Sequence, residues 1–137
     1  RLDHLIEAFS TLAVEQSIPQ EMHQVLVGVR DDERARSLQG ASPVRERILL
    51  TGRIPDAELP AWYRRCELFV YPSEYEGFGL GPLEAMSSGA PVLTSRNSAL
   101  AEVLGEAAEY ARPGVDGLRE GIASLLGDGP KRERMRA

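Results

Sequence analysis

The stretch ELFVYPSEYEGFGLGPLEAMSSGAPVLTS, residues 67–95, contains the clearest series of elements in this sequence. Residues 67–71 form an apolar run with strand composition, and a loop rich in glycine follows them. Residues 83–86 favour a helix that ends at Gly89, and PVLTS at 91–95 favours a second strand. Because both strand candidates are continuous apolar runs rather than alternating ones, they predict a parallel sheet covered by helices on both faces.

The alternation of helix and strand continues on both sides of this stretch. The further elements are a helix over 2–13, a strand at 24–29, a helix over 31–39, a strand at 48–52, a helix capped by Asp56, a weaker strand at 108–111 and an amphipathic helix over 118–126. The predicted fold class is therefore α/β, with a doubly wound, Rossmann-like parallel sheet. Ligands of such sheets bind beyond the carboxyl ends of the strands, so the site is expected in the loops after Val29, Gly52, Tyr71 and Ser95.

The composition argues against several classes of partner and setting. With 21 acidic and 16 basic residues the net charge is -5, which disfavours nucleic acid as a partner. Cys66 is the only cysteine and cannot form an internal disulfide, and no apolar run approaches the roughly 20 residues of a membrane-spanning helix. These features indicate a reducing, cytoplasmic setting. His4 and His23 lack metal-ligand spacing, so we predict no metal site and no separate cofactor.

A glycine turn leads into the helix of the quoted stretch. Gly77, Phe78 and Gly79 precede the helix start, where unpaired backbone N–H groups and the helix dipole favour an anion such as phosphate. Turns of this composition also occur in α/β folds for steric reasons alone. The turn therefore needs support from its neighbours.

Two glutamates bracket this turn. Glu76 lies just before the helix and Glu84 on its first or second turn, so both carboxylates can accept hydrogen bonds from hydroxyls in one crevice. Glu7 and Glu15 have the same spacing on the first helix, where solvated positions explain them. Only the pair at 76 and 84 flanks a glycine turn after an apolar strand, and ribose or sugar hydroxyls are its natural ligands.

The quoted stretch resembles the carboxyl-terminal domain of family 4 glycosyltransferases, retaining enzymes of the two-domain GT-B architecture. The likeness includes the glutamate pair with seven residues between, the EGFGL and LEAM runs, SSGAPV, and the following loop SRNSALAEVLGEAAEYARP. RLDHLIEAF, ILLTGRI and ELPAWYRRCELFVYPS resemble earlier segments of the same domain, so the resemblance spans nearly the whole chain.

The resemblance implies roles for the residues of the loop and its helix. Glu84 would hold the ribose hydroxyls, and Glu76 is the candidate catalytic residue, which would hold a hydroxyl of the donor sugar. The N–H groups of Phe78, Gly79 and Leu80 would meet phosphate or sugar oxygens, and Gly77 before them would also belong to the nucleotide-sugar-binding site.

The resemblance also places the nucleobase beside the loop after residues 48–52. Arg53 and Ile54 lie at the position that would bind the nucleotide, with the backbone of Ile54 meeting the base. Backbone recognition hides the identity of the base in the sequence. The loop SRNSALAEV is similar to that of mannosyltransferases, which makes a guanosine nucleotide the first choice.

The sequence departs from the family pattern at two places. The family holds the diphosphate with an arginine and a lysine near the first strand and helix, whereas Lys131, in the charged tail, is the only lysine here. Both cations are therefore expected upstream. The family often has proline at the position of Gly81, whereas here Pro82 follows, and a proline in the first helical turn predicts only a small local change.

The predicted function is transfer of a sugar from a nucleoside-diphosphate sugar to an acceptor glycan, lipid or small molecule, with retained stereochemistry. Residues 1–137 would be the partial donor-binding domain, inactive alone because the acceptor-binding domain is absent. One alternative, a nicotinamide-dependent oxidoreductase, lacks its glycine fingerprint because Pro82 or Glu84 occupies the third position. A non-catalytic nucleotide-binding module of the same fold is the other alternative.

Strand order predicts a break in the sheet. In the order 3-2-1-4-5-6 the first strand lies between the second and the fourth, and this sequence begins with the helix that follows the first strand. Residues 24–29 and 67–71 would then be the second and fourth strands, without a strand between them. We therefore expect the chain to lack its first strand and to belong to a longer protein.

The remaining candidates have structural interpretations. Cys66 is predicted to be a small packed residue, and Trp62 and Tyr63 are predicted to pack along their helix. The basic tail residues are predicted to form a solvated helix face, with a peripheral contact at the inner face of a membrane as the alternative; they are Lys131, Arg132, Arg134 and Arg136.

Overall fold

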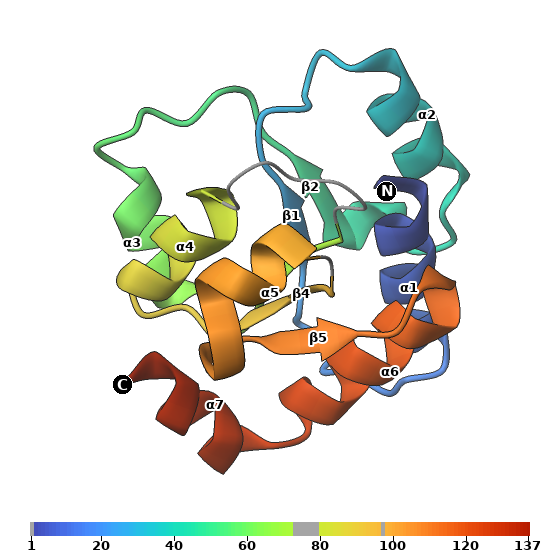
Figure 1. Ribbon diagram of the computed structural model, residues 1–137. Coiled ribbons are helices and arrows are strands. Elements are labelled where there is room, and N and C mark those ends of the chain that lie inside the picture. Colours follow the sequence, from blue (N-terminus) through green and yellow to red (C-terminus); the bar gives the residue numbers. More distant parts are fainter. Residues whose placement is uncertain (1, 73–79, 97) are drawn as a thin grey trace.

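Figure 1 shows the computed structural model of the chain, in which residues 2–72, 80–96 and 98–137 are described. Helices and strands alternate along most of it, as the sequence predicts. The helices are α1 (Leu2–Val14), α2 (Glu33–Ala41), η1 (Arg45–Arg47), α3 (Leu59–Arg65), α4 (Leu80–Ser87), α5 (Ser98–Leu104), η2 (Gly105–Ala107), α6 (Gly114–Leu126) and α7 (Gly129–Arg136). The strands are β1 (Gln24–Leu26), β2 (Ile48–Leu50), β3 (Phe69–Tyr71), β4 (Val92–Ser95) and β5 (Glu109–Ala111).

Two helices differ from the sequence prediction. The segment taken for a loop after β4 contains α5, whose alanine and leucine residues favour a helix. Asp56 lies in a turn and does not cap α3, since Glu58 is the N-terminal cap residue. With Asp56 as the cap, Pro60 would occupy the first position whose N–H the helix requires, and proline has none.

The strands form two parallel sheets. β1 pairs with β2, with Val25 opposite Leu49, and β4 pairs with β3 on one side and β5 on the other. Among the described residues no strand pairing joins β1 to β3. The prediction of a parallel α/β fold is confirmed, and the break lies where the strand order places it. The upstream strand itself stays a prediction.

The strand β4 is covered on both faces. Val92 and Leu93 are adjacent in sequence, so they point to opposite faces, and both are almost fully buried at 0% and 1% exposure. Leu93 belongs to the core that contains Ile6 and Phe9 of α1 and Ile122 of α6. Val92 belongs to a second core, which contains Ala85 of α4 and Leu104 of α5. Burial on both faces explains the continuous apolar run at 91–95.

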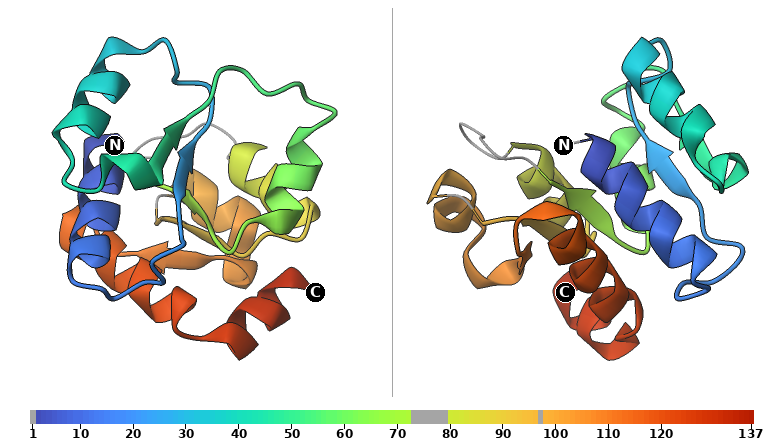
Figure 2. Two further views of the ribbon diagram at one scale, coloured as in Figure 1. Left: turned by 180° about the vertical axis from the view of Figure 1, so that it is seen from behind. Right: turned by 90° about the vertical axis from the view of Figure 1, so that its right-hand side faces the viewer.

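Figure 2 shows the two layers of helices. α1, α2 and α6 lie on one side of the strands, and α3, α4 and α5 lie on the other. The second layer covers β3, β4 and β5 but leaves one face of β1 and β2 open, where Val25, Val27 and Leu49 are 36%, 45% and 47% exposed. None of the described helices is long and apolar enough to cross a membrane.

Candidate functional site

The candidate site lies where β3 ends and α4 begins. Tyr71 is the last residue of β3, and α4 starts at Leu80. The predicted site residues Glu76, Gly77, Phe78 and Gly79 lie between them, outside the described residues. The structure therefore fixes the two elements that flank the glycine turn.

Glu84 lies on the second turn of α4 and is exposed. Tyr63 of α3 lies close enough to be affected by its charge: burial raises the pKa of the Tyr63 hydroxyl, and the nearby charges of Glu84 and Cys66 raise it further. The Glu84 side chain is thus accessible to solvent on the second turn of α4. An exposed carboxylate retains its capacity to accept hydrogen bonds from a ligand.

A row of aromatic rings supports the start of α4. The ring of Tyr63 packs edge-on against Phe69 at 5.3 Å between centroids, and Phe69 stacks on Tyr71 at 6.1 Å. A Cβ atom at Gly81 would lie 3.4 Å from Cε2 of Tyr71, so α4 approaches this ring closely. Pro82 is fully buried beside Gly81 in the first turn. The first turn of α4 therefore packs against the last ring of β3.

The end of β3 is also tied to β4. Thr94 is 0% exposed, and its Oγ1 donates a hydrogen bond of 2.8 Å to the carbonyl of Tyr71. This bond orients the peptide group from which the loop departs. The predicted packing of Tyr63 is confirmed by its ring contact, whereas Trp62 is 43% exposed, so the prediction that it packs was wrong. Trp62 lies on the outer side of α3, where no described helix covers it.

The predicted nucleobase loop follows β2. Ile54 is buried at 8% exposure, and Arg53 beside it is exposed. The chain after β1 is hydrogen-bonded to this region, since the N–H of Thr51 donates to Leu26 and the N–H groups after Val27 donate back to Thr51 and Gly52. The two loops therefore form one hydrogen-bonded unit at the carboxyl ends of β1 and β2.

Two arginines that sequence reasoning missed lie at the same edge. Arg30 is exposed after β1, and a Cβ atom at Gly52 would lie 3.5 Å from its Nη1. Arg96 is exposed after β4, with its guanidinium 4.2 Å from the ring centroid of Tyr110. Each of these arginines follows a strand in the sequence. This position indicates a role at the site only when the strands are known to be parallel, because the carboxyl ends of parallel strands lie at one edge.

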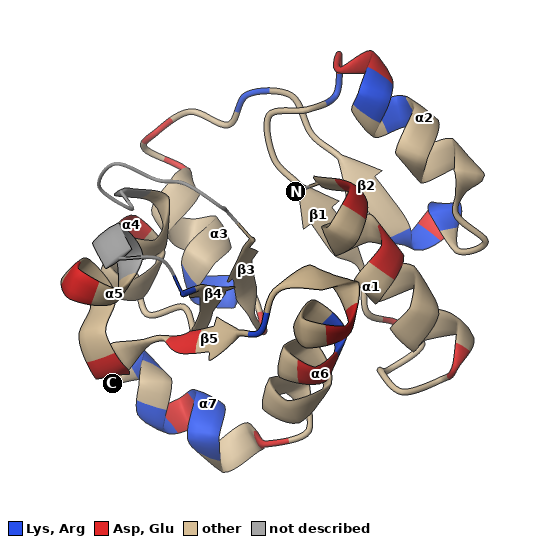
Figure 3. Cartoon of the chain, turned by 45° about the vertical axis from the view of Figure 1, so that its right-hand side comes forward, with Lys and Arg blue, Asp and Glu red and all other residues tan. Residues whose placement is uncertain are grey.

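The basic tail differs from its prediction. Figure 3 shows closely spaced basic residues on α7. Lys131 Nζ lies 2.8 Å from Glu109 Oε1, and the guanidinium groups of Arg132 and Arg136 bind backbone carbonyls of other elements. Only Arg134 of the four is exposed. The prediction of a solvated helix face was therefore wrong for Lys131, Arg132 and Arg136, because the fold brings carbonyl and carboxylate acceptors within their reach.

Cys66 is a half-buried packed residue, as predicted. Its Sγ donates to the carbonyl of Tyr63 at 3.2 Å, and burial raises the pKa of the thiol while the charge of Arg136 lowers it. A thiol held in its neutral form is a poor nucleophile. In the described ranges 2–72, 80–96 and 98–137, no group of three or more His, Cys, Asp or Glu side chains could hold a metal ion.

Comparison with known proteins identifies a family and several relatives of the chain. The family model "Glycosyl transferases group 1" matches residues 1–137. Serotype-specific mannosyltransferase WbdA of Escherichia coli is 38% identical over 132 residues, which are 93% of this chain and 16% of that protein. The MMP alpha-(1->4)-mannosyltransferase of Mycolicibacterium hassiacum is 34% identical over 137 residues, which are 97% of this chain and 32% of that protein. This chain thus spans at most about a third of these relatives.

A solved structure shares the fold. The carboxyl-terminal domain of a glycosyl transferase group 1 family protein, LpcC, from Francisella tularensis matches with a TM-score of 0.80 at 24% identity. The match covers 98% of this chain and 72% of that one. The predicted likeness to the carboxyl-terminal half of a GT-B protein is confirmed at the level of the fold.

Proposed function

The chain belongs to the group 1 glycosyl transferases, and we propose that it is the donor-binding domain of a retaining, family 4 enzyme that uses a nucleoside-diphosphate sugar. The observation that carries the proposal is the place of Glu84, an exposed carboxylate on the helix that follows the carboxyl end of β3. Ligands of parallel α/β sheets bind at this edge. A carboxylate there can accept hydrogen bonds from both hydroxyls of a ribose.

The remaining roles follow the path of the donor along this edge. Glu76 binds a hydroxyl of the transferred sugar as the candidate catalytic residue. Residues 78–80 offer backbone N–H groups to phosphate or sugar oxygens, and the positive end of the α4 dipole at Leu80 favours an anion. The loop with Arg53 and Ile54 binds the base. These roles rest on the family pattern and on the helix position.

The chemistry of transfer requires stabilisation of the leaving diphosphate. Negative charge develops on its oxygens as the glycosidic bond breaks, and preorganised N–H donors and cations at that point lower the barrier. Arg30, Arg53 and Arg96 are exposed cations at the carboxyl ends of β1, β2 and β4 and can contribute to this charge balance. The donor is the only small molecule that the proposal requires, and no separate cofactor enters.

The transferred sugar is proposed to be mannose, and the nucleotide a guanosine diphosphate. Support comes from two relatives of this chain that are named mannosyltransferases. We further propose that an acceptor glycan, lipid or small molecule binds to another domain of a longer, cytoplasmic protein. The 137 residues would then bind the donor without transferring its sugar.

A thermal-shift comparison tests the proposal. Guanosine diphosphate should raise the unfolding midpoint more than the uridine and adenosine diphosphates, because a ligand of the folded state stabilises it by about 2.7 kcal/mol at a hundredfold excess over Kd. Glu84→Ala should remove most of this shift. Glu7→Ala, which alters an exposed glutamate on α1, is the matched control and should leave the shift unchanged. Stabilisation by NAD and by none of the three nucleoside diphosphates would overturn the proposal.

A further inference from the structure

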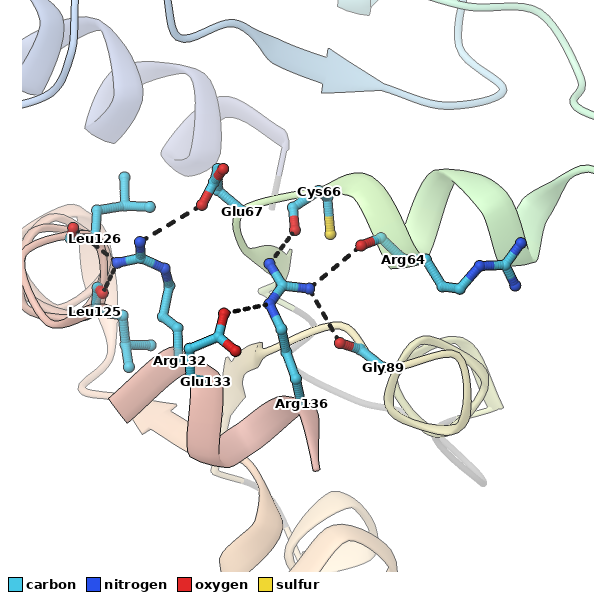
Figure 4. A network of polar contacts seen from close by, with 9 residues as sticks. All are labelled: Arg64, Cys66, Glu67, Gly89, Leu125, Leu126, Arg132, Glu133 and Arg136. Atoms are coloured by element: carbon cyan, nitrogen blue, oxygen red, sulfur yellow. Dashed lines mark hydrogen bonds and ion pairs between the residues drawn. The ribbon is translucent and has the colours of Figure 1, made fainter. Parts of the chain in front are cut away.

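The helix α7 is held mainly by polar contacts, with Met135 as its partly buried contact with the main core. It has eight residues, and none of them is buried. Its start is fixed by Asp128, whose Oδ1 accepts a hydrogen bond of 3.0 Å from the N–H of Lys131. A helix this short is marginal without tertiary contacts. The contacts that hold it come chiefly from two arginines one turn apart, Arg132 and Arg136 (Figure 4).

Arg136 joins the carboxyl ends of two helices. Its Nη2 donates to the carbonyl of Cys66 at 2.8 Å, and its Nη1 donates to the carbonyls of Gly89 at 3.1 Å and Arg64 at 3.3 Å. Arg64 and Cys66 end α3, and Gly89 lies in the turn that ends α4. Figure 4 shows the guanidinium between these carbonyls. Its side chain is only 24% exposed.

Arg132 makes the equivalent contact with a third helix. Its Nη1 donates to the carbonyls of Leu125 at 2.7 Å and Leu126 at 2.8 Å, which are the last residues of α6. Its Nη2 lies 3.5 Å from Glu67 Oε2, just after α3. Carbonyls at a helix end lack the N–H partner of the next helical turn and carry the negative end of the helix dipole, and the carbonyl of Leu125 accepts the N–H of Asp128 as well. The planar guanidinium offers five donors, which suits it to several carbonyls at once.

The contact with Gly89 fixes the end of α4. Gly89 has φ +89°, and the N–H groups of Gly89 and Ala90 donate back to Met86 and Ala85 to close the helix. Glu84 lies one turn before this closure, since its carbonyl accepts the N–H of Ser88. With eight residues, α4 is only about 12 Å long. A displacement of its end therefore displaces Glu84.

We propose that Arg136 is a positioning residue for α4, and that α7 sets the place of the Glu84 carboxylate by fixing the ends of α3 and α4 together. This inference rests on the proposed function for its consequence in ligand binding. The structural part of the inference, that Arg136 fixes the end of α4, does not depend on that function. α4 is then supported at its start by the Tyr71 ring and at its end by the Arg136 guanidinium.

The test compares three variants of the chain in calorimetric titration with guanosine diphosphate and in hydrogen exchange of the backbone amides. Arg136→Met keeps the apolar stem and loses every donor; we expect roughly three- to tenfold weaker binding and faster exchange at residues 88–90. Arg136→Lys retains a smaller set of donors and should lie between Met and the unaltered chain. Arg134→Met changes an exposed arginine of the same helix outside the network, and should alter neither quantity.

Two results would overturn the inference. One is a folded Arg136→Met variant that binds guanosine diphosphate as tightly as the unaltered chain, which would leave Arg136 with a role in stability only. The other is unchanged exchange at residues 88–90. Should the unaltered chain bind no nucleoside diphosphate, the proposed function fails, and the exchange measurement still decides whether Arg136 fixes α4. Should Arg136→Met fail to fold, Arg136→Lys replaces it, and values equal to those of the unaltered chain then overturn the inference.

Discussion

The two sheets of this chain differ in how their faces are covered. β4 lies between β3 and β5 and has a helix layer on each side, so Val92 and Leu93 are both almost fully buried. β1 and β2 have helices on one side only, and Leu49 at the centre of β2 is 47% exposed. Both regions have parallel strands with apolar sequences, and they differ in the helices that cover their faces.

Because of this difference, the covered sheet and the open pair of strands have different roles in the proposed site. The helix that carries Glu84 belongs to the covered sheet, where aromatic packing, a buried threonine and the Arg136 guanidinium fix its ends. The loop proposed to meet the base belongs to the open pair. Precise placement of a ligand group requires a rigid support, so the larger contribution to nucleotide binding should come from the covered side. Five predictions test this comparison, from the largest expected effect to the smallest.

Truncation of a central leucine should separate the two sheets most clearly. Leu93→Ala removes a side chain that is 1% exposed in the main core and should lower the free energy of unfolding by about 3 to 5 kcal/mol. Leu49→Ala is the matched change in β2 and should cost less than about 1 kcal/mol, since much of that side chain already contacts solvent. Urea unfolding of both variants measures the difference. Equal losses would mean that the open face is covered in solution.

Removal of charged groups should show which sheet carries the binding energy. Glu84→Ala should weaken binding of guanosine diphosphate by about ten- to a hundredfold, or 1.5 to 3 kcal/mol, because a charged hydrogen-bond acceptor is lost. Arg53→Ala, on the open side, should weaken it by no more than about threefold, since an exposed cation contributes little. Calorimetric titration gives both values.

The two glutamates should also be separable in that assay. Glu76→Ala should weaken binding of the nucleoside-diphosphate sugar and leave binding of the free nucleoside diphosphate almost unaffected. A loss for the free nucleotide equal to that of Glu84→Ala would contradict the division between ribose and sugar.

Alanine substitutions at two helical glycines should change the free energy of unfolding in opposite directions. A Cβ atom at Gly121 of α6 would lie 3.0 and 3.1 Å from the methyl groups of Leu93, so Gly121→Ala should destabilise the covered sheet by about 1 to 3 kcal/mol. A Cβ atom at Gly40 of α2 meets nothing within 4 Å, and Gly40→Ala should stabilise by up to about 1 kcal/mol. Thermal unfolding of both variants provides the test. Destabilisation at Gly40 would show that α2 packs against a further element.

The smallest effect should be a pH dependence from Cys66. Burial raises the pKa of this thiol in the folded chain, with Arg136 opposing part of the rise. Above the ordinary pKa of about 8.5, the unfolded chain loses the proton first and binds fewer protons, so stability falls as pH rises toward the folded pKa. Unfolding free energies between about pH 7 and 9.5 should therefore decline more steeply in the unaltered chain than in Cys66→Ala. Equal slopes would contradict the burial of the thiol.

Much of the fold could be predicted because its signals are local. The continuous apolar run of β4 indicated a strand buried on both faces, and Pro82 and Gly89 marked the start and end of α4. The resemblance to glycosyltransferases rested on the same local runs, and the family match agrees with it. Asp56 misled the placement of α3 because its local signal competed with Pro60, and the position of the proline decided the start of the helix.

The roles of the basic tail could not be predicted, because the partners of its residues are remote in the chain. Cys66 and Gly89 precede Arg136 by 70 and 47 residues, and nothing near Arg136 in the sequence identifies their carbonyls as acceptors. The composition of the tail allowed a solvated face equally well. The exposure of Trp62 has the same origin, since burial depends on which helix lies opposite.

The sequence alone determined most of the element types, the α/β class and the pair of glutamates around a glycine turn, because each depends on residues within one or two turns of one another. The tertiary structure decided which strands pair, which face of β2 stays open and where the arginines of α7 bind. Those outcomes depend on the packing of segments far apart in the chain, which fixes the ends of α4 and thereby the place of Glu84.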